Sequence, residues 1–457
     1  MMPVMSTLSF FRQWFEKHQD QIRDDYFHFL RFHSISTEPE FKSEILLCAD
    51  WVSDYLAKSG FKTKFVETSG HPIVFAEKIV DPAKETLLIY GHYDVQPVDP
   101  IELWESDPFT PTERDNRIYA RGAVDDKGQI FYAMVAMRAL ADQDIPLPVN
   151  IKFCIEGEEE AGSTGLFLAL PENRDLLSAD SLLVVDFDGY NETTPAINLG
   201  VRGLVSMDVT VTGSKSDLHS GLCGGIAYNP NRALVELLAK LYTKDGSIAV
   251  DGFYDGVLEP TAAEKAAYPP QHDEKYYREQ FGIEAFGAEK GRTLQEANIF
   301  RPTLEINGIG GGYSGPGFKT VIPAKAVAKI SCRLVPNQDP ARVGNQIKAF
   351  LEKHCVKGMK VDVNLHSGAF AFRANPTSKL ALAVSTAAAE VCGKACKNVL
   401  SGASIPVIAA LSSELKLETV GMGYGLPTDQ IHAPNEHFDF RRFELGFLTV
   451  ATAIGKL

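Results

Sequence analysis

The order of hydrophobic and polar positions predicts alternating helices and strands over the first part of the chain. Residues 8–32 carry large apolar side chains at helical spacing, which predicts an amphipathic helix. Three short apolar runs, residues 86–92, 148–156 and 181–187, are typical of buried strands, and residues 127–142 have the pattern of a helix. Because helices alternate with buried strands, we expect an α/β fold with a mostly parallel sheet.

The pattern changes after residue 203 and returns near residue 377. The intervening region predicts several strands, two helices and a long polar stretch at about 250–300. The strands are expected at 204–212, 302–307, 324–335 and 359–366, and the helices at 229–243 and 338–355. We therefore expect an α+β domain, residues 204–374, inserted into an α/β domain made of residues 1–203 and 375–457.

Composition and charge narrow the class of protein. The chain has 457 residues, of which 45% are hydrophobic and 23% charged, which suits two or three globular domains. A net charge of -14 argues against a nucleic-acid partner, which would need clustered Lys and Arg. We find no signal peptide and no apolar run of about 18 residues, so we expect no membrane partner. Residues 8–32 also contain Asp20, Asp24 and Asp25, which anionic lipid would repel, so this helix is expected to face the core.

The cysteines indicate a reducing environment. Their number is odd, they are scattered, and none forms a Cys-x-x-Cys pair. They are Cys48, Cys154, Cys223, Cys332, Cys355, Cys392 and Cys396. Such a set is not a disulfide framework, so we expect free thiols and a cytoplasmic location.

Candidate ligands for metal ions follow the predicted strands. His92 and Asp94 come after the first of them, Glu158-Glu159-Glu160 after the second, and Asp186 and Asp188 at the end of the third. Open α/β sheets bind ligands beyond the carboxyl ends of their strands, so these side chains are expected to converge there. Asp125 and His432, which lie in predicted loops, complete the set.

Two histidines and several carboxylates suit a pair of divalent ions, which generate a nucleophile from water at neutral pH. Asp125 is our choice of bridge, because a carboxylate has two oxygens for two cations. Within the acidic run, one carboxylate could hold a metal while its neighbour transfers a proton. Either Asp186 or Asp188 could be the ligand after the third strand, and Asp188 is preferred because it lies on the loop side. Taken singly, His92 is also compatible with a hydrogen-bonded core histidine, and the acidic run with a solvated loop.

Six segments together resemble the M20 metallopeptidases, and within them the carnosinase-like cytosolic non-specific dipeptidases. They are Gly91-His92-Tyr93-Asp94-Val95-Gln96-Pro97, residues 119–128, residues 156–163, Asp217-Leu218-His219-Ser220-Gly221, residues 319–323 and residues 333–336. The resemblance runs from about residue 20 to the C-terminus. It implies a zinc-aminopeptidase-like catalytic domain and an inserted lid that also forms a homodimer.

The resemblance also implies roles for the candidate residues. His92, Asp125 and Asp188 would bind one zinc ion, with manganese or cobalt as alternatives. Asp125, Glu160 and His432 would bind the other. Glu159 would be the general base and Asp94 would orient His92, and the bond between Asp125 and Asp126 would be cis.

Five further residues are implied to contact the substrate. His219 would stabilise the oxyanion, reaching the site from the other subunit, and Arg333 would bind the substrate carboxylate. Asn307, Thr320 and Ser404 would line the substrate pocket. The expected function is metal-dependent hydrolysis of dipeptides with broad specificity. The alternatives are an N-acyl-amino-acid amidohydrolase or a carboxypeptidase on the same scaffold, and a non-catalytic metal-binding protein, which the complete ligand set disfavours.

Overall fold

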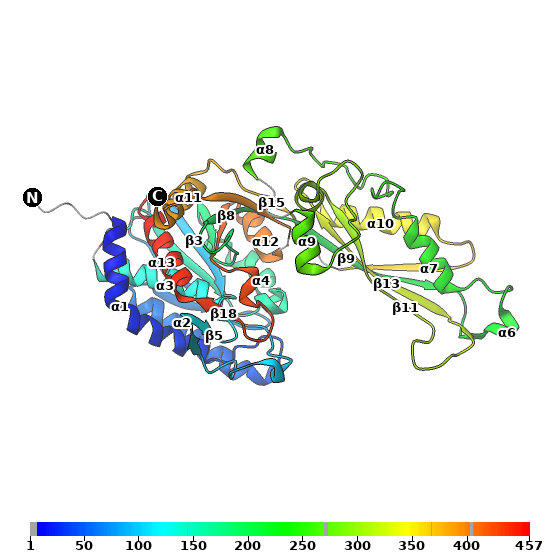
Figure 1. The fold of residues 1–457 in the computed structure, drawn as a ribbon, viewed down its shortest axis with the longest axis horizontal. Helices are drawn as coiled ribbons and strands as arrows, with labels where there is room; N and C mark the ends of the chain where they lie inside the picture. The colour runs from blue at the N-terminus through cyan, green and yellow to red at the C-terminus, as the bar shows by residue number, and fades with distance from the viewer. Residues whose placement is uncertain (1–6, 144, 269–272, 367, 403–404) are drawn as a thin grey trace, which may run out of the picture. The chain divides into compact units, whose positions relative to one another are not determined.

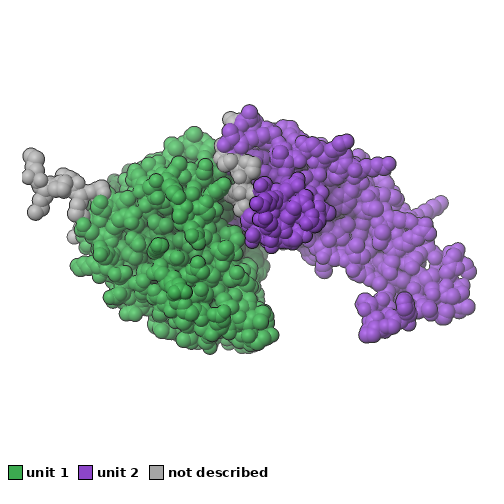
Figure 2. Space-filling model, viewed as in Figure 1, with its two compact units in different colours: residues 1–200, 374–400, 410–457 green, residues 201–373, 401–409 purple. Residues whose placement is uncertain are grey.

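The computed structural model describes residues 7–143, 145–268, 273–366, 368–402 and 405–457. The chain forms two compact units (Figure 2). Unit 1 comprises residues 1–200, 374–400 and 410–457, and unit 2 comprises residues 201–373 and 401–409. The expected junctions, at 203/204 and 374/375, differ from these by a few residues. Residues 401–409 were expected in the α/β domain and group instead with unit 2.

Unit 1 is built on a mixed sheet whose strands follow the order β1-β2-β6-β3-β7-β17-β8, with β16 paired to β8. Their bounds are β1 Lys62–Val66, β2 Ile73–Lys78, β3 Thr86–His92, β6 Asn150–Glu156, β7 Ser181–Val184, β8 Ala196–Val201, β16 Lys397–Ser401 and β17 Glu418–Met422. Strands β3 and β8 of this sheet are labelled in Figure 1. A small second sheet joins β4 Thr112–Arg114, β5 Arg117–Tyr119 and β18 His437–Asp439.

The centre of the large sheet is parallel, as expected, but its flanks are not. Strands β6, β3, β7 and β17 pair in parallel, whereas β1, β2 and β8 pair antiparallel to their neighbours. The connection between β1 and β2 is short, and a short connection can join only antiparallel neighbours. The mostly parallel sheet that the sequence predicted is therefore a mixed one.

The helices of unit 1 are α1 Thr7–Leu30, α2 Lys42–Lys58, α3 Lys127–Asp142, α4 Thr164–Ala169, α5 Arg174–Leu177, α11 Lys379–Cys392 and α13 Phe440–Ile454; α12 Pro406–Leu415 crosses the boundary between the units. Two of them, α1 and α3, correspond to the helices that the sequence predicted at 8–32 and 127–142, and both bury their apolar faces. Helix α3 is apolar on nearly every side and packs on α1, α2 and α13. Trp14 and Phe15 of α1 pack against Phe447 of α13, so this helix faces the core as expected. Within the described residues, no helix has the length and apolarity needed to span a membrane.

Unit 2 is an antiparallel sheet covered by helices. The strands follow the order β11-β13-β9-β14, and the bounds are β9 Gly203–Thr212, β11 Thr303–Gly311, β13 Lys325–Leu334 and β14 Lys360–Leu365. A small pair joins β10 Leu218–His219 to β12 Val321–Ile322, and β15 is Phe372–Arg373. The helices are α6 Ser220–Cys223, α7 Pro230–Ala239, α8 Ala262–Ala267, α9 Glu274–Phe281 and α10 Pro340–His354.

The register of the unit 2 sheet sorts its side chains into two faces. In β9, buried and half-buried positions alternate strictly. Val205, Val209 and Val211 form one core with apolar residues of α7 and α10. Helices α8 and α9 lie in the stretch for which the sequence predicted no element. Helix α9 spans only 8 residues and buries none of its side chains, so its sequence is too short for a periodic pattern to stand out.

Candidate metal centre

His92 is buried at the end of β3 and its ring is oriented by Asp94. Its Nδ1 lies 3.1 Å from the backbone oxygen of Asp94 and 3.3 Å from Oδ1 of the same residue. This leaves Nε2 for a metal, because a ligating imidazole is normally oriented through its other nitrogen. The buried Asp94 carboxylate also accepts the backbone N–H groups of Glu159 and Glu160, at 3.2 and 3.1 Å. One carboxylate therefore positions both a candidate ligand and the acidic segment.

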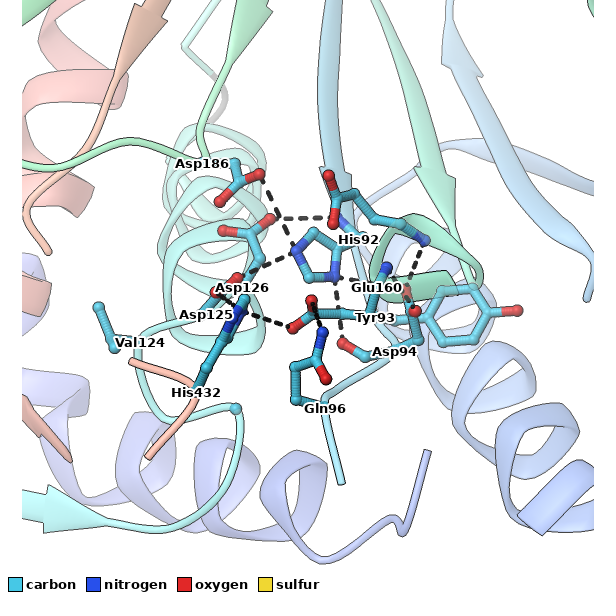
Figure 3. A network of polar contacts seen from close by, with 12 residues as sticks. His92, Tyr93, Asp94, Gln96, Val124, Asp125, Asp126, Glu160, Asp186 and His432 are labelled. Carbon is cyan, nitrogen blue, oxygen red and sulfur yellow. Dashed lines mark hydrogen bonds and ion pairs between the residues drawn. The ribbon is translucent and has the colours of Figure 1, made fainter. Parts of the chain in front are cut away.

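Asp125 lies between the two histidines (Figure 3). Its Oδ1 is 3.1 Å from Nε2 of His92, and its Oδ2 is 3.0 Å from Nε2 of His432. Two groups of three residues share it: His92, Asp125 and Asp186, and Asp125, Glu160 and His432. In each group the ligand atoms lie within 4.8 Å of one another. The peptide bond between Asp125 and Asp126 is cis, as the resemblance implied.

Asp186, not Asp188, lies with His92 and Asp125. Oδ2 of Asp186 is 3.9 Å from Nε2 of His92, whereas Asp188 belongs to neither group and is exposed. The preference for Asp188 rested on a strand reaching residue 187, but β7 ends at Val184. By Asp188 the chain has left the sheet edge and its backbone bridges to Gly425.

The charges of this site suit cations. Burial, reinforced by the carboxylates of Asp126 and Asp125, raises the pKa of Asp186 well above its ordinary value. Burial also raises the pKa of Glu159 to about 7, although His92 opposes this shift. Hydrogen bonds to Asp125 and Glu160 raise the pKa of His432 to about 10. Carboxylates outnumber imidazoles here, and divalent cations would offset the excess negative charge. The donor set of imidazole nitrogens and carboxylate oxygens is one that Zn²⁺ accepts.

Two positioning residues were not singled out by the sequence. Gln96 donates to Oε2 of Glu160 at 2.7 Å and leaves Oε1 facing His432, at 3.2 Å from its Nε2. The buried Glu436 accepts Nη1 of Arg121 at 2.7 Å. It also accepts the backbone N–H groups of Gly122, Val124 and Asp125, at 3.0, 3.0 and 3.1 Å.

Glu436 thus holds the loop that presents Asp125. Gln96 stands inside the first of the segments quoted above, and Gln96 and Glu436 each lie four residues after a candidate ligand, His92 and His432 respectively. That equal spacing was the available signal. It does not by itself reveal the contacts, which join segments far apart in the chain.

Glu159 opens the short 3₁₀ turn Glu159–Ala161 and is partly exposed. Its carboxylate is close enough to Glu160, Asp125 and His92 for their charges to shift its pKa. The neighbouring Glu158 faces elsewhere, because its Oε2 accepts the hydroxyl of Thr68 at 3.4 Å. Within the acidic run, Glu159 and Glu160 are therefore directed to the candidate centre.

The remaining candidates belong to unit 2, and are described within that unit. His219 is exposed, and its Nδ1 accepts the N–H of Gly221 at 2.9 Å. Thr320 lies beside it, since its backbone oxygen accepts the N–H of Ser220 at 3.0 Å. Asn307 lies at an irregularity in the pairing of β11 with β13 and is exposed, and Arg333 is half-buried on β13. Ser404 lies outside the described residues.

Two overlapping groups of imidazole and carboxylate ligands at the carboxyl edge of an α/β sheet define the class of hydrolases built around paired metal sites. Within that class, the chain belongs to peptidase family M20/M25/M40, whose sequence profile matches residues 88–456. It is 32% identical over 447 residues to the Cys-Gly metallodipeptidase dug1 of Schizosaccharomyces pombe, with 93% of each chain covered.

Two further relatives agree with this assignment. The chain is 32% identical over 443 residues to the Beta-Ala-His dipeptidase of Homo sapiens, which covers 93% of this chain and 87% of that one. The structure of the present chain resembles that of the M20 family metallo-carboxypeptidase Sso-CP2 from Sulfolobus solfataricus, with a TM-score of 0.84 and 32% identity. That match covers 95% of this chain and 98% of the other.

Proposed function

We propose that this protein hydrolyses the peptide bond of dipeptides with broad specificity, using two divalent metal ions. The main support for this proposal is the position of Asp125. Its two carboxylate oxygens face the two histidines, one in each of the two overlapping ligand groups. Two of the relatives carry the names of dipeptidases, one for Cys-Gly and one for Beta-Ala-His. Zinc is the expected metal, and manganese or cobalt are the alternatives.

Each residue of the site has a role in this reaction. His92, Asp125 and Asp186 would hold one ion, and Asp125, Glu160 and His432 the other. Bound divalent ions supply Lewis acidity and lower the pKa of water. Glu159 takes the proton of the attacking water and delivers it to the leaving amine. Arg333 binds the carboxylate of the substrate.

His219 is proposed to donate a hydrogen bond to the developing oxyanion. Because Nδ1 accepts the N–H of Gly221, the neutral ring carries its proton on Nε2, which is therefore a donor. We expect His219→Ala to lower kcat by roughly 10² or more with metal content unchanged. Steady-state kinetics and metal analysis of the purified variant test this. A near-normal kcat would assign His219 to the local turn instead.

The central test of the proposed function is a substrate panel. Metal-reconstituted protein is incubated with Ala-Ala-type and Cys-Gly dipeptides, a tripeptide and N-acetylated amino acids, each with and without a chelator. We expect cleavage of free dipeptides that a chelator abolishes and added Zn²⁺ restores. Cleavage of the N-acetylated compounds alone would assign the protein to the N-acyl-amino-acid amidohydrolases. The absence of any turnover would favour a non-catalytic metal-binding protein.

We further propose that two copies of the chain associate through unit 2. This unit exposes large apolar side chains near α6 and α7. Among them are Leu222, Ile226 and Val235, whose exposed fractions are 74%, 84% and 55%. A monomer rarely leaves so many apolar side chains together in water. The mass in solution, measured by sedimentation, tests the homodimer.

The cytoplasm is the proposed compartment, because all seven cysteines are free thiols.

A further inference from the structure

Arg202 and Arg333 share one face of the unit 2 sheet. Arg333 of β13 pairs directly with Leu204 of β9, and Arg202 precedes Leu204 by two residues. Residues opposite each other in an antiparallel pair point to the same face, and so do residues two apart in extended backbone. The helices cover the other face, where Val205 and Cys332 are buried. The two arginines therefore project together from the face opposite the helices.

Arg202 is held in place, yet one of its nitrogens is unused. Its Nε donates to the backbone oxygen of Gly402 at 2.8 Å, and its Nη2 to Oδ1 of Asn298 at 3.3 Å. Nη1 is buried and has no hydrogen-bond partner in the described part of the chain. A buried N–H group without a partner is costly, so it marks a place where an acceptor is missing.

The charges of the two arginines are also unbalanced. Burial and the nearby charge of Arg333 lower the pKa of Arg202 to about 10, although the carboxylate of Glu305 opposes part of this shift. Among the described residues, no carboxylate forms an ion pair with either arginine. Glu305 of β11 is the nearest acidic group by register, but it pairs with Ser331 and lies diagonal to Arg333. The two guanidinium groups are therefore not neutralised by a direct ion pair within the described residues, which suits them to bind an anion.

We propose that Arg202 and Arg333 form one carboxylate site, which binds the C-terminal carboxylate of the substrate. This rests on the proposed function and deepens it, because it makes Arg202 a second specificity-determining residue. A carboxylate offers two oxygens to two guanidinium groups, which are well suited to planar, charge-assisted hydrogen bonds. The contacts of Arg202 with Gly402 and Asn298 hold its guanidinium ready, so little order is lost when the substrate binds.

The test compares a dipeptide with its C-terminal amide, in the unaltered protein and in Arg202→Ala and Arg202→Lys variants. We expect Arg202→Ala to lower kcat/KM for the dipeptide by about 10- to 100-fold, mainly through KM. The lysine variant should recover part of the loss. The amide lacks the charge, so its kcat/KM should change by less than about threefold. If the amide is cleaved too slowly, its Ki as a competitive inhibitor replaces kcat/KM.

The control is Arg292→Ala in the same unit, because Arg292 is already paired with Glu259. It should leave both substrates unaffected. An equal loss for dipeptide and amide in Arg202→Ala would overturn the proposal and leave Arg202 a support for the backbone at Gly402. An unchanged dipeptide rate would overturn it as well. Failure of the proposed function itself would look different, since the unaltered protein would then cleave no dipeptide.

Discussion

Glu159→Gln should abolish dipeptide turnover, lowering kcat by about 10² to 10⁴ while the protein keeps its metal. The substitution preserves size and removes only the ability to accept and return a proton. Glu159 belongs to neither group of candidate ligands, so its loss should not release an ion. The measurement is steady-state kinetics on a free dipeptide, together with metal analysis of the same preparation.

Glu158→Gln is the matched control, because Glu158 has the same chemistry one residue away but contacts Thr68 rather than the centre. Its rate should remain near that of the unaltered protein. Retained activity in Glu159→Gln would remove Glu159 as the base. A loss of metal in Glu159→Gln would instead place it among the ligands.

The second prediction with a large expected effect tests whether Asp186 or Asp188 is the metal ligand. Asp186→Asn should lower both metal content, from about two ions to about one per chain, and activity. The fall in activity should exceed the 10- to 100-fold typical of a residue that only orients a ligand. The reason is geometric, since Asp186 approaches Nε2 of His92 to 3.9 Å and shares its group with Asp125.

Asp188→Asn serves as the comparison, because the two residues stand in the same segment and lose the same charge. It should keep both ions and most of the activity. For both variants, the metal content is measured after dialysis and the activity is then measured by steady-state kinetics. The opposite ranking, with Asp188→Asn losing the ion, would restore Asp188 as the ligand and show that the loop rearranges around the metal.

The local sequence was sufficient to predict a helix or strand where that element has a strong hydrophobic periodicity of its own. The strand predicted at 86–92 is β3, and the helix predicted at 127–142 is α3, with the same bounds. His92, Asp125, Glu160 and His432 were all chosen from the sequence, and the structure brings them together. Their residue types carry the signal, because imidazole nitrogens and carboxylate oxygens are the side-chain donors that bind divalent ions such as Zn²⁺.

Prediction was weaker where an element depends on its neighbours. Residues 181–187 read as one apolar run, but β7 stops at Val184. The registered pairing of β7 with β3 and β17 covers residues 181–184. Beyond it, only isolated contacts follow, among them the N–H of Val185 to the oxygen of Tyr90 at 3.0 Å and the bridge from Asp188 to Gly425. The choice between Asp186 and Asp188 depended on where the strand ends. Asp188 was preferred, whereas Asp186 is the residue that lies with His92 and Asp125.

What the sequence by itself determined is the set of helices and strands with strong periodicity, the family resemblance and the chemical identity of the candidate ligands. Tertiary structure decided which carboxylate joins His92, and how Glu436 reaches the backbone N–H of Asp125 across 311 residues of chain. It also decided, through the register of β9 and β13, that Arg202 and Arg333 share a face. The physical reason is that periodicity records only which side of an element is buried. Contacts between distant segments follow from strand register and packing, which no local pattern specifies.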